Sequence, residues 1–111
     1  LYGRAFEHFI ILELKAYLSY RRIHEKLSYW RSKHGHEVDL LIGDTIAIEI
    51  KSATKISEKH LKGLIYLREE GIFKKYILVC NDPLERKVKD IEITHWKVFL
   101  TRLWSDNILI S

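Results

Sequence analysis

The sequence has very little cysteine or proline and no long hydrophobic run. Its single cysteine, Cys80, excludes an internal disulfide framework and favours a reducing compartment, so we expect a cytoplasmic protein. One proline and five glycines in 111 residues leave no stretch with the composition of a flexible linker. Charged residues interrupt the apolar runs well before the roughly 20 residues that a membrane-spanning helix needs, so we expect no membrane association.

Methionine is absent, and the sequence begins with Leu1. Because translation starts with methionine, we expect residues 1–111 to be the C-terminal part of a longer chain. Their length suits a single domain with one hydrophobic core. A composition of 47% apolar and 31% charged residues is that of an ordinary folded domain. The net charge of +4 permits contact with nucleic acid without requiring it.

Hydrophobic periodicity predicts a helix near each end of the chain and strands between them. Residues 3–22 have helical spacing, with one polar stripe and apolar residues over most of the remaining circumference, so we expect this helix to be buried on most sides. Further helices are predicted at 57–70 and 95–104, and strands at 27–33, 37–42, 45–52, 75–80 and 88–94. The order α-β-β-β-α-β-(β)-α predicts an α/β fold whose mixed sheet is flanked by helices.

The second and third predicted strands carry three charged residues among apolar ones, and the hairpin register decides whether these share a face. A two-residue loop would mix Glu49 with the apolar residues of the preceding strand. A three-residue loop pairs Ile42 with Ile46 and gives one unbroken apolar face, consisting of Val38, Leu40, Ile42, Ile46, Ile48 and Ile50. We therefore predict the three-residue loop, which sets Asp39 opposite Glu49, with Lys51 on the same face.

Two facing carboxylates repel each other unless a cation lies between them. Two acids and a main-chain oxygen suit Mg²⁺, and a neighbouring lysine can orient a water molecule or stabilise negative charge at a reacting phosphate. The alternative is a solvated polar face on which Lys51 only neutralises Asp39 and Glu49. The first helix favours a site, because Glu7 and Glu13 lie off its polar stripe, where a carboxylate needs a partner. For Glu13 we expect an arginine, a lysine or a backbone donor.

Taken together, four segments resemble the PD-(D/E)XK nuclease superfamily, also called restriction-endonuclease-like. They are Gly3-Arg4-Ala5-Phe6-Glu7, Tyr29-Trp30-Arg31, Glu37-Val38-Asp39 and Ile48-Glu49-Ile50-Lys51. More narrowly, the sequence looks like the C-terminal nuclease-like domain of a family of prokaryotic AAA+ ATPases, in which an ATPase module comes first. The resemblance covers residues 3 to about 79 and implies a restriction-endonuclease-like α-β-β-β-α-β core.

The resemblance implies hydrolysis of phosphodiester bonds in DNA with Mg²⁺ or Mn²⁺. By this likeness Asp39 and Glu49 match the metal-binding acids, Glu7 completes the metal site from the helix, the Ile50 carbonyl assists as a main-chain ligand, and Lys51 is the catalytic lysine. The alternative is a non-catalytic module of an AAA+ ATPase that binds nucleic acid or a partner chain, a second copy of itself included. The intact set of two acids and a lysine favours the enzyme.

Two departures from the superfamily pattern concern neighbouring positions. Val38 stands where many members have proline before the first acid, and Lys62-x₃-Tyr66 stands where some relatives have Gln-x₃-Tyr. Lys59 and Lys62 share a face of the predicted helix and are the candidates for DNA phosphate contacts, with a plain solvated face as the alternative. His34 and His36 flank a glycine, but the chain has only one cysteine and its other histidines are scattered, so we expect a turn rather than a zinc site.

Overall fold

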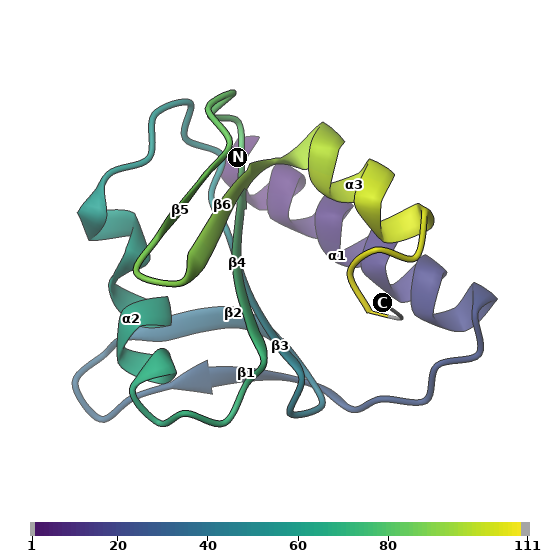
Figure 1. Ribbon diagram of the computed structural model, residues 1–111, viewed down its shortest axis with the longest axis horizontal. Coiled ribbons are helices and arrows are strands. Elements are labelled where there is room, and N and C mark those ends of the chain that lie inside the picture. Colours follow the sequence, from purple (N-terminus) through teal and green to yellow (C-terminus); the bar gives the residue numbers. More distant parts are fainter. Residues whose placement is uncertain (1, 110–111) are drawn as a thin grey trace.

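A computed structural model, which describes residues 2–109, has a six-stranded sheet with helices on both faces (Figure 1). Among the helices of these residues, none is both long and apolar enough to cross a membrane. In chain order the elements are α1 (Tyr2–Tyr20), β1 (Leu27–Arg31), β2 (Glu37–Ile42), β3 (Ile46–Ile50), the 3₁₀ helix η1 (Glu58–Leu61), α2 (Lys62–Arg68), β4 (Lys75–Cys80), β5 (Arg86–Val88), β6 (Ile91–His95) and α3 (Trp96–Trp104).

The strands follow the spatial order β1-β2-β3-β4-β6-β5. The first three strands form an antiparallel meander, whereas β3, β4 and β6 run parallel to one another. The segment containing η1 and α2 connects β3 to β4, as parallel neighbours require a crossover. This arrangement confirms the predicted α/β class with a mixed sheet.

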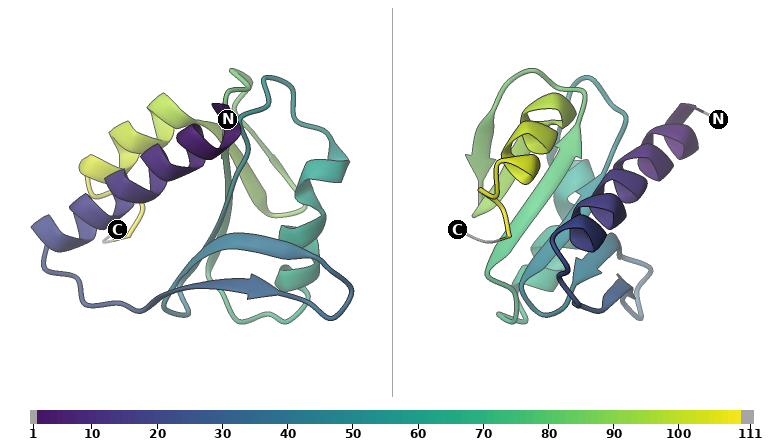
Figure 2. Two further views of the ribbon diagram at one scale, coloured as in Figure 1. Left: turned by 180° about the vertical axis from the view of Figure 1, so that it is seen from behind. Right: turned by 90° about the vertical axis from the view of Figure 1, so that its right-hand side faces the viewer.

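The sheet separates two hydrophobic clusters. On one face α1 and α3 lie side by side, and their buried residues, among them Ile10, Tyr17 and Phe99, pack on Ile48 and Val79 of the central strands. On the other face η1 packs through Leu61, and α2 packs through Leu64 and Leu67. Figure 2 shows the two-helix layer on one side of the sheet and α2 on the other. Because β3 is covered on both faces, all five of its residues are buried.

The prediction that the first helix is buried on most sides is wrong. Phe9 is 42% exposed and Leu12 is 50% exposed, because α1 lies at the surface and turns only one stripe, centred on Ile10 and Leu14, towards the sheet. The helix also ends two residues earlier than predicted. Arg22 has a left-handed backbone (φ 57°), and the Ile23 amide donates to the Leu18 carbonyl over 2.9 Å, which closes the helix in a Schellman motif.

The single strand predicted at 88–94 is two strands joined by a tight turn. Lys89 and Asp90 both have left-handed backbones, with φ of 51° and 67°, and they join β5 to β6 in a two-residue hairpin. Such turns match the right-handed twist of the strands but usually carry asparagine or glycine. Here the sequence contains neither residue at the turn, so the hairpin was not predicted.

The β2–β3 hairpin has the predicted three-residue loop, since Ile42 pairs with Ile46 and Leu40 with Ile48. Val38, however, does not join the apolar face of Leu40, and it packs in the opposite cluster. The cause is a bulge in β2: β1 pairs in one register at Leu41 and in a register shifted by one residue at Val38. An extra residue in one strand reverses the side to which the following side chains point.

Candidate active site

Asp39 and Glu49 lie where β2 and β3 separate. The backbone ladder ends at the pair Leu40–Ile48, one residue before the predicted pair of Asp39 with Glu49. Beyond that point the carboxylates replace the ladder. The Asp39 amide donates to Glu49 Oε1 over 3.0 Å, and the Ile50 amide donates to Asp39 Oδ2 over 2.8 Å. Each acid thus holds the backbone of the opposite strand, which fixes the two carboxyl groups close to each other at the end of the ladder.

The strands separate because β3 continues along β4 while β2 bulges. Glu49 pairs with Leu78, and the Lys51 amide donates to the Val79 carbonyl over 2.9 Å, so the chain stays on β4 beyond the end of β3. β2, by contrast, begins beside α2 (Figure 1). The gap between the two strands forms a pocket of about 250 Å³, and Asp39, Glu49 and Lys51 all line it.

Glu7 reaches this cluster from α1, one turn before Ile10. The pKa of Glu7 is raised to about 7, chiefly by burial. A hydrogen bond to the Asp39 carboxyl group and the negative charge of Asp39 contribute to this rise. Burial also raises the pKa of Asp39 to about 7, with further contributions from its hydrogen bond and charge repulsion with Glu49. Near neutral pH Glu7 and Asp39 are therefore partly protonated, whereas isolated carboxyl groups would have lost their protons.

Lys51 follows directly on β3 and forms an ion pair with one of these acids, Glu49. Its Nζ lies 3.5 Å from Glu49 Oε2, and its side chain is 41% exposed, against 8% for that of Glu49. Its positive charge opposes the rise in the pKa of Glu7. Lys59 and Lys62, the two predicted phosphate contacts, line the same pocket from η1 and the start of α2.

The donor atoms of this cluster suit a hard divalent cation, but the side chains do not stand in a metal-holding arrangement. Glu7, Asp39 and Glu49 offer carboxylate oxygens only, which are the donors that Mg²⁺ and Mn²⁺ prefer. Burial and the neighbouring carboxyl groups raise the pKa of Glu7 and of Asp39, so a cation bound among them would favour their ionised forms. Within residues 2–109, no group of three or more His, Cys, Asp or Glu side chains already stands in a metal-holding arrangement. Ile50 has its amide bound to Asp39 and its side chain in the core.

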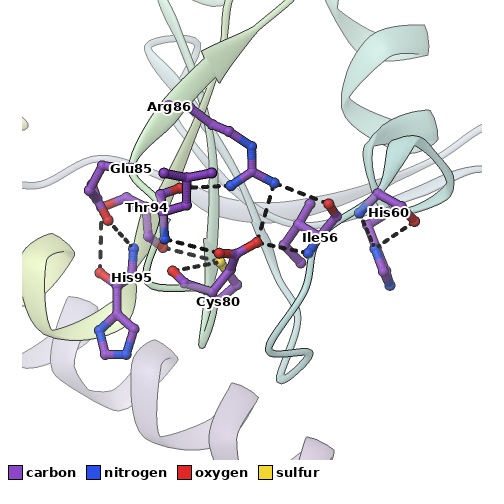
Figure 3. Close-up of polar contacts among 10 residues, drawn as sticks. Ile56, His60, Cys80, Glu85, Arg86, Thr94 and His95 are labelled. Atoms are coloured by element: carbon purple, nitrogen blue, oxygen red, sulfur yellow. Dashed lines mark hydrogen bonds and ion pairs between the residues drawn. The ribbon is translucent and has the colours of Figure 1, made fainter.

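A second polar cluster holds the connection between β3 and η1 in place (Figure 3). Lys59, which lines the pocket, belongs to η1. Asp82 Oδ2 accepts from the Ile56 amide over 2.9 Å, and Arg86 Nη2 donates to the Ile56 carbonyl over 3.0 Å. Asn81 Nδ2 also donates to the Ser52 carbonyl over 3.0 Å. These contacts tie the connection between β3 and η1 to the end of β4 and to the start of β5.

Gly63 lets α2 approach the start of β2 more closely than any other residue would. A Cβ atom at this position would lie 2.1 Å from the carbonyl oxygen of Glu37. The approach brings Tyr66 onto His36, and their rings stack with centroids 3.9 Å apart and an interplanar angle of 20°. Sequence reasoning missed this pair and the pocket-lining His60. The glycine in the middle of an otherwise helical segment was the available signal.

We expect Gly63→Ala to destabilise the domain by about 1–3 kcal/mol, because the new methyl group meets backbone that cannot move aside without shifting α2. The measurement is the urea midpoint of unfolding. Gly3→Ala is the matched control, since a Cβ atom there makes only an ordinary contact, 3.6 Å from Ser52 Oγ, and should leave stability nearly unchanged. Equal midpoints for the two variants would show that the close approach of α2 is not needed.

Glu13, the other acid off the polar stripe, takes no part in this site. Its Oε1 accepts from Trp104 Nε1 over 3.2 Å, so its partner is an indole rather than the arginine, lysine or backbone donor expected. This bond joins α1 to α3, which makes the role of Glu13 structural.

The fold and site together define an α/β domain with a cluster of three acids and a lysine at a split in its sheet. The chain matches the family model described as Domain of unknown function (DUF4143) over residues 2–99, and it belongs to that family. No curated protein and no solved structure matches the sequence.

Proposed function

We propose that this domain hydrolyses phosphodiester bonds in DNA with Mg²⁺ or Mn²⁺, as a nuclease of the PD-(D/E)XK type, and that it works as the C-terminal module of an AAA+ ATPase. The observation that carries the proposal is the reciprocal bonding of Asp39 and Glu49 across two separating strands. It holds two carboxylates together despite their repulsion, with Lys51 beside them. A purely structural role would not require like charges to be brought together in a pocket.

The roles follow from the positions of the side chains. Glu7, Asp39 and Glu49 would hold the cation, with the Ile50 carbonyl as an additional ligand. Bound Mg²⁺ would supply Lewis-acid stabilisation and lower the pKa of a bound water molecule. Lys51, whose ammonium group reaches the same pocket, would orient the attacking water and stabilise the charge that develops on the phosphate.

Lys59 and Lys62 would contact the DNA backbone on either side of the reacting phosphate. Both line the pocket, and neither is among the lysines bonded to an acid in residues 2–109. Such contacts position the strand without reading its sequence. We therefore expect cleavage that depends weakly on sequence and strongly on salt concentration.

The test is metal-dependent cleavage by the 111-residue chain, using single-stranded, duplex and branched DNA. We expect cleavage with Mg²⁺ or Mn²⁺ and none with chelator, and we expect Asp39→Asn to reduce the rate by about 100-fold or more, since several kcal/mol of transition-state stabilisation are lost. Asp44→Asn makes the same chemical change at an exposed position of the same hairpin and should have no effect.

Calorimetry provides a second measurement that does not depend on turnover. Mn²⁺ should bind the wild-type chain and raise its melting temperature by mass action, and Asp39→Asn should abolish both effects. A chain that neither cleaves any of these substrates nor binds Mn²⁺ at millimolar concentration would not be a nuclease. That outcome would instead support the non-catalytic module that binds nucleic acid or a partner chain.

A further inference from the structure

We propose that the stacked pair His36–Tyr66 is a platform for an unpaired base, so that the site takes single-stranded or frayed DNA in preference to intact duplex. The inference rests on the proposed function for its substrate, but it concerns binding and can be measured without cleavage.

The two rings have the geometry of a stacking surface. They are nearly parallel, at 20°, with their centroids 3.9 Å apart, so one face of the Tyr66 ring is covered by His36. Tyr66 is nevertheless 46% exposed. An aromatic ring fixed on one side and open on the other is the element with which proteins hold bases of single strands, because every base has a π-face.

The platform is fixed by the backbone and not only by the two side chains. Gly63 packs directly on the Glu37 carbonyl, and Glu37 follows His36 in the chain. Tyr66 comes three residues after Gly63, on the same side of α2. The contact that holds α2 against β2 therefore also holds Tyr66 over His36, which lowers the entropy cost of stacking a base there.

The platform stands beside the proposed reaction centre. His36 lines the same pocket as Asp39 and Glu49. Asp39 comes three positions after His36 in the chain, which corresponds to about 10 Å along an extended segment. A base on the platform and a phosphate at the acids would then belong to nearby nucleotides of one strand. Lys59 and Lys62 line the pocket next to this path and match the charge of its backbone.

Duplex DNA cannot use this platform along its length. Its bases stack on one another, so their faces become available only at ends, at gaps or after unpairing. The lysines of the pocket would attract either form of DNA, since they would contact phosphates. The aromatic pair therefore provides the discrimination between the two forms, and the lysines provide affinity common to both.

The experiment measures the affinity of the 111-residue chain, in metal-free buffer at fixed salt, for a fluorescent single-stranded oligonucleotide and for a blunt hairpin duplex of the same composition. We expect Tyr66→Ala to weaken single-strand binding by about tenfold, and to leave duplex binding within about twofold. Tyr66→Trp should retain the preference for single strands. Tyr20→Ala is the control, since Tyr20, on the last turn of α1, is also an exposed tyrosine, 70% exposed against 46% for Tyr66.

The outcomes separate this inference from the proposed function. The wild-type chain could cleave DNA with metal while Tyr66→Ala binds both probes as the wild type does. That result would overturn the platform and leave the nuclease intact. Binding to single strands that depends on Tyr66, in a chain that never cleaves, would support the platform and refute the nuclease. Equal losses for the two probes, or no single-strand binding by the wild type, would overturn the platform.

Discussion

Replacing Lys51 with alanine is expected to reduce DNA cleavage by about 10²–10³-fold while leaving DNA affinity nearly unchanged. The ammonium group of Lys51 lies 3.5 Å from Glu49 Oε2 and reaches into the pocket of the acids. A charge there would act mainly on the transition state, where negative charge on the phosphate increases. Binding should lose no more than one phosphate contact, which is about 0.9 of a unit in the slope of log affinity against log salt.

Lys59→Ala is the matched control for this prediction, because Lys59 lines the same pocket without contacting the acids. We expect it to weaken binding by one phosphate contact and to leave the rate of cleavage of bound DNA unchanged. Single-turnover cleavage with saturating protein, together with a salt titration of affinity, distinguishes the two variants. If both lysines affected only binding, Lys51 would have no role in the chemistry.

The same Lys51 variant also tests the structural alternative, in which the lysine only neutralises the acids. In that case Lys51→Ala should lower the melting temperature in metal-free buffer, and Mg²⁺ should restore it. The Lys51 side chain is 41% exposed, so solvent screens its ion pair with Glu49, and solvent-screened pairs contribute only about 0–1 kcal/mol. We therefore expect a small change in melting temperature beside a large change in cleavage rate.

The hairpin that holds the acids could be predicted because its hydrophobic pattern permits one register. Ile46, Ile48 and Ile50 alternate strictly, and a slip by one residue would have moved all three to the wrong face. That constraint predicts the pair Ile42–Ile46, which the structure confirms. It also predicts Asp39 opposite Glu49, and although the ladder ends one pair earlier, each of these acids accepts from the backbone of the other strand.

The features that were not predicted depend on contacts between distant parts of the chain. Alternation assumes even pairing, so it could not foresee the bulge that turns Val38 to the other face. A helical wheel shows which residues share a side, but not how many neighbours the helix has, and so the exposure of Phe9 was missed. His36 and Tyr66 meet only because α2 crosses the start of β2.

The metal-free domain is expected to be more stable at pH 5 than at pH 8. The pKa values of Glu7 and Asp39 rise to about 7 in the folded chain, from 4.5 and 3.8 in isolated groups. Between those limits the folded state binds more protons than the unfolded state, so stability is full below about pH 4 and falls as the pH rises through 7. We expect a loss of about 2 kcal/mol, after allowing for solvent screening of these partly exposed groups.

Asp39→Asn should remove most of this pH dependence and make the metal-free domain at least as stable as the wild type at pH 8. The amide cannot ionise, so neither Glu7 nor Glu49 faces a charge at that position, while its oxygen can still accept from the Ile50 amide. Urea unfolding at several pH values provides the measurement, with Asp44→Asn as the control that should keep the wild-type slope. His60, whose pKa is lowered chiefly by burial, favours unfolding at acid pH, but it does so equally in all three chains.

A slope that persists in Asp39→Asn would mean that the acids do not share a proton. A wild-type slope that reverses with saturating Mg²⁺ would show that the same repulsion serves to hold a cation, since metal binding requires the carboxylates to be ionised.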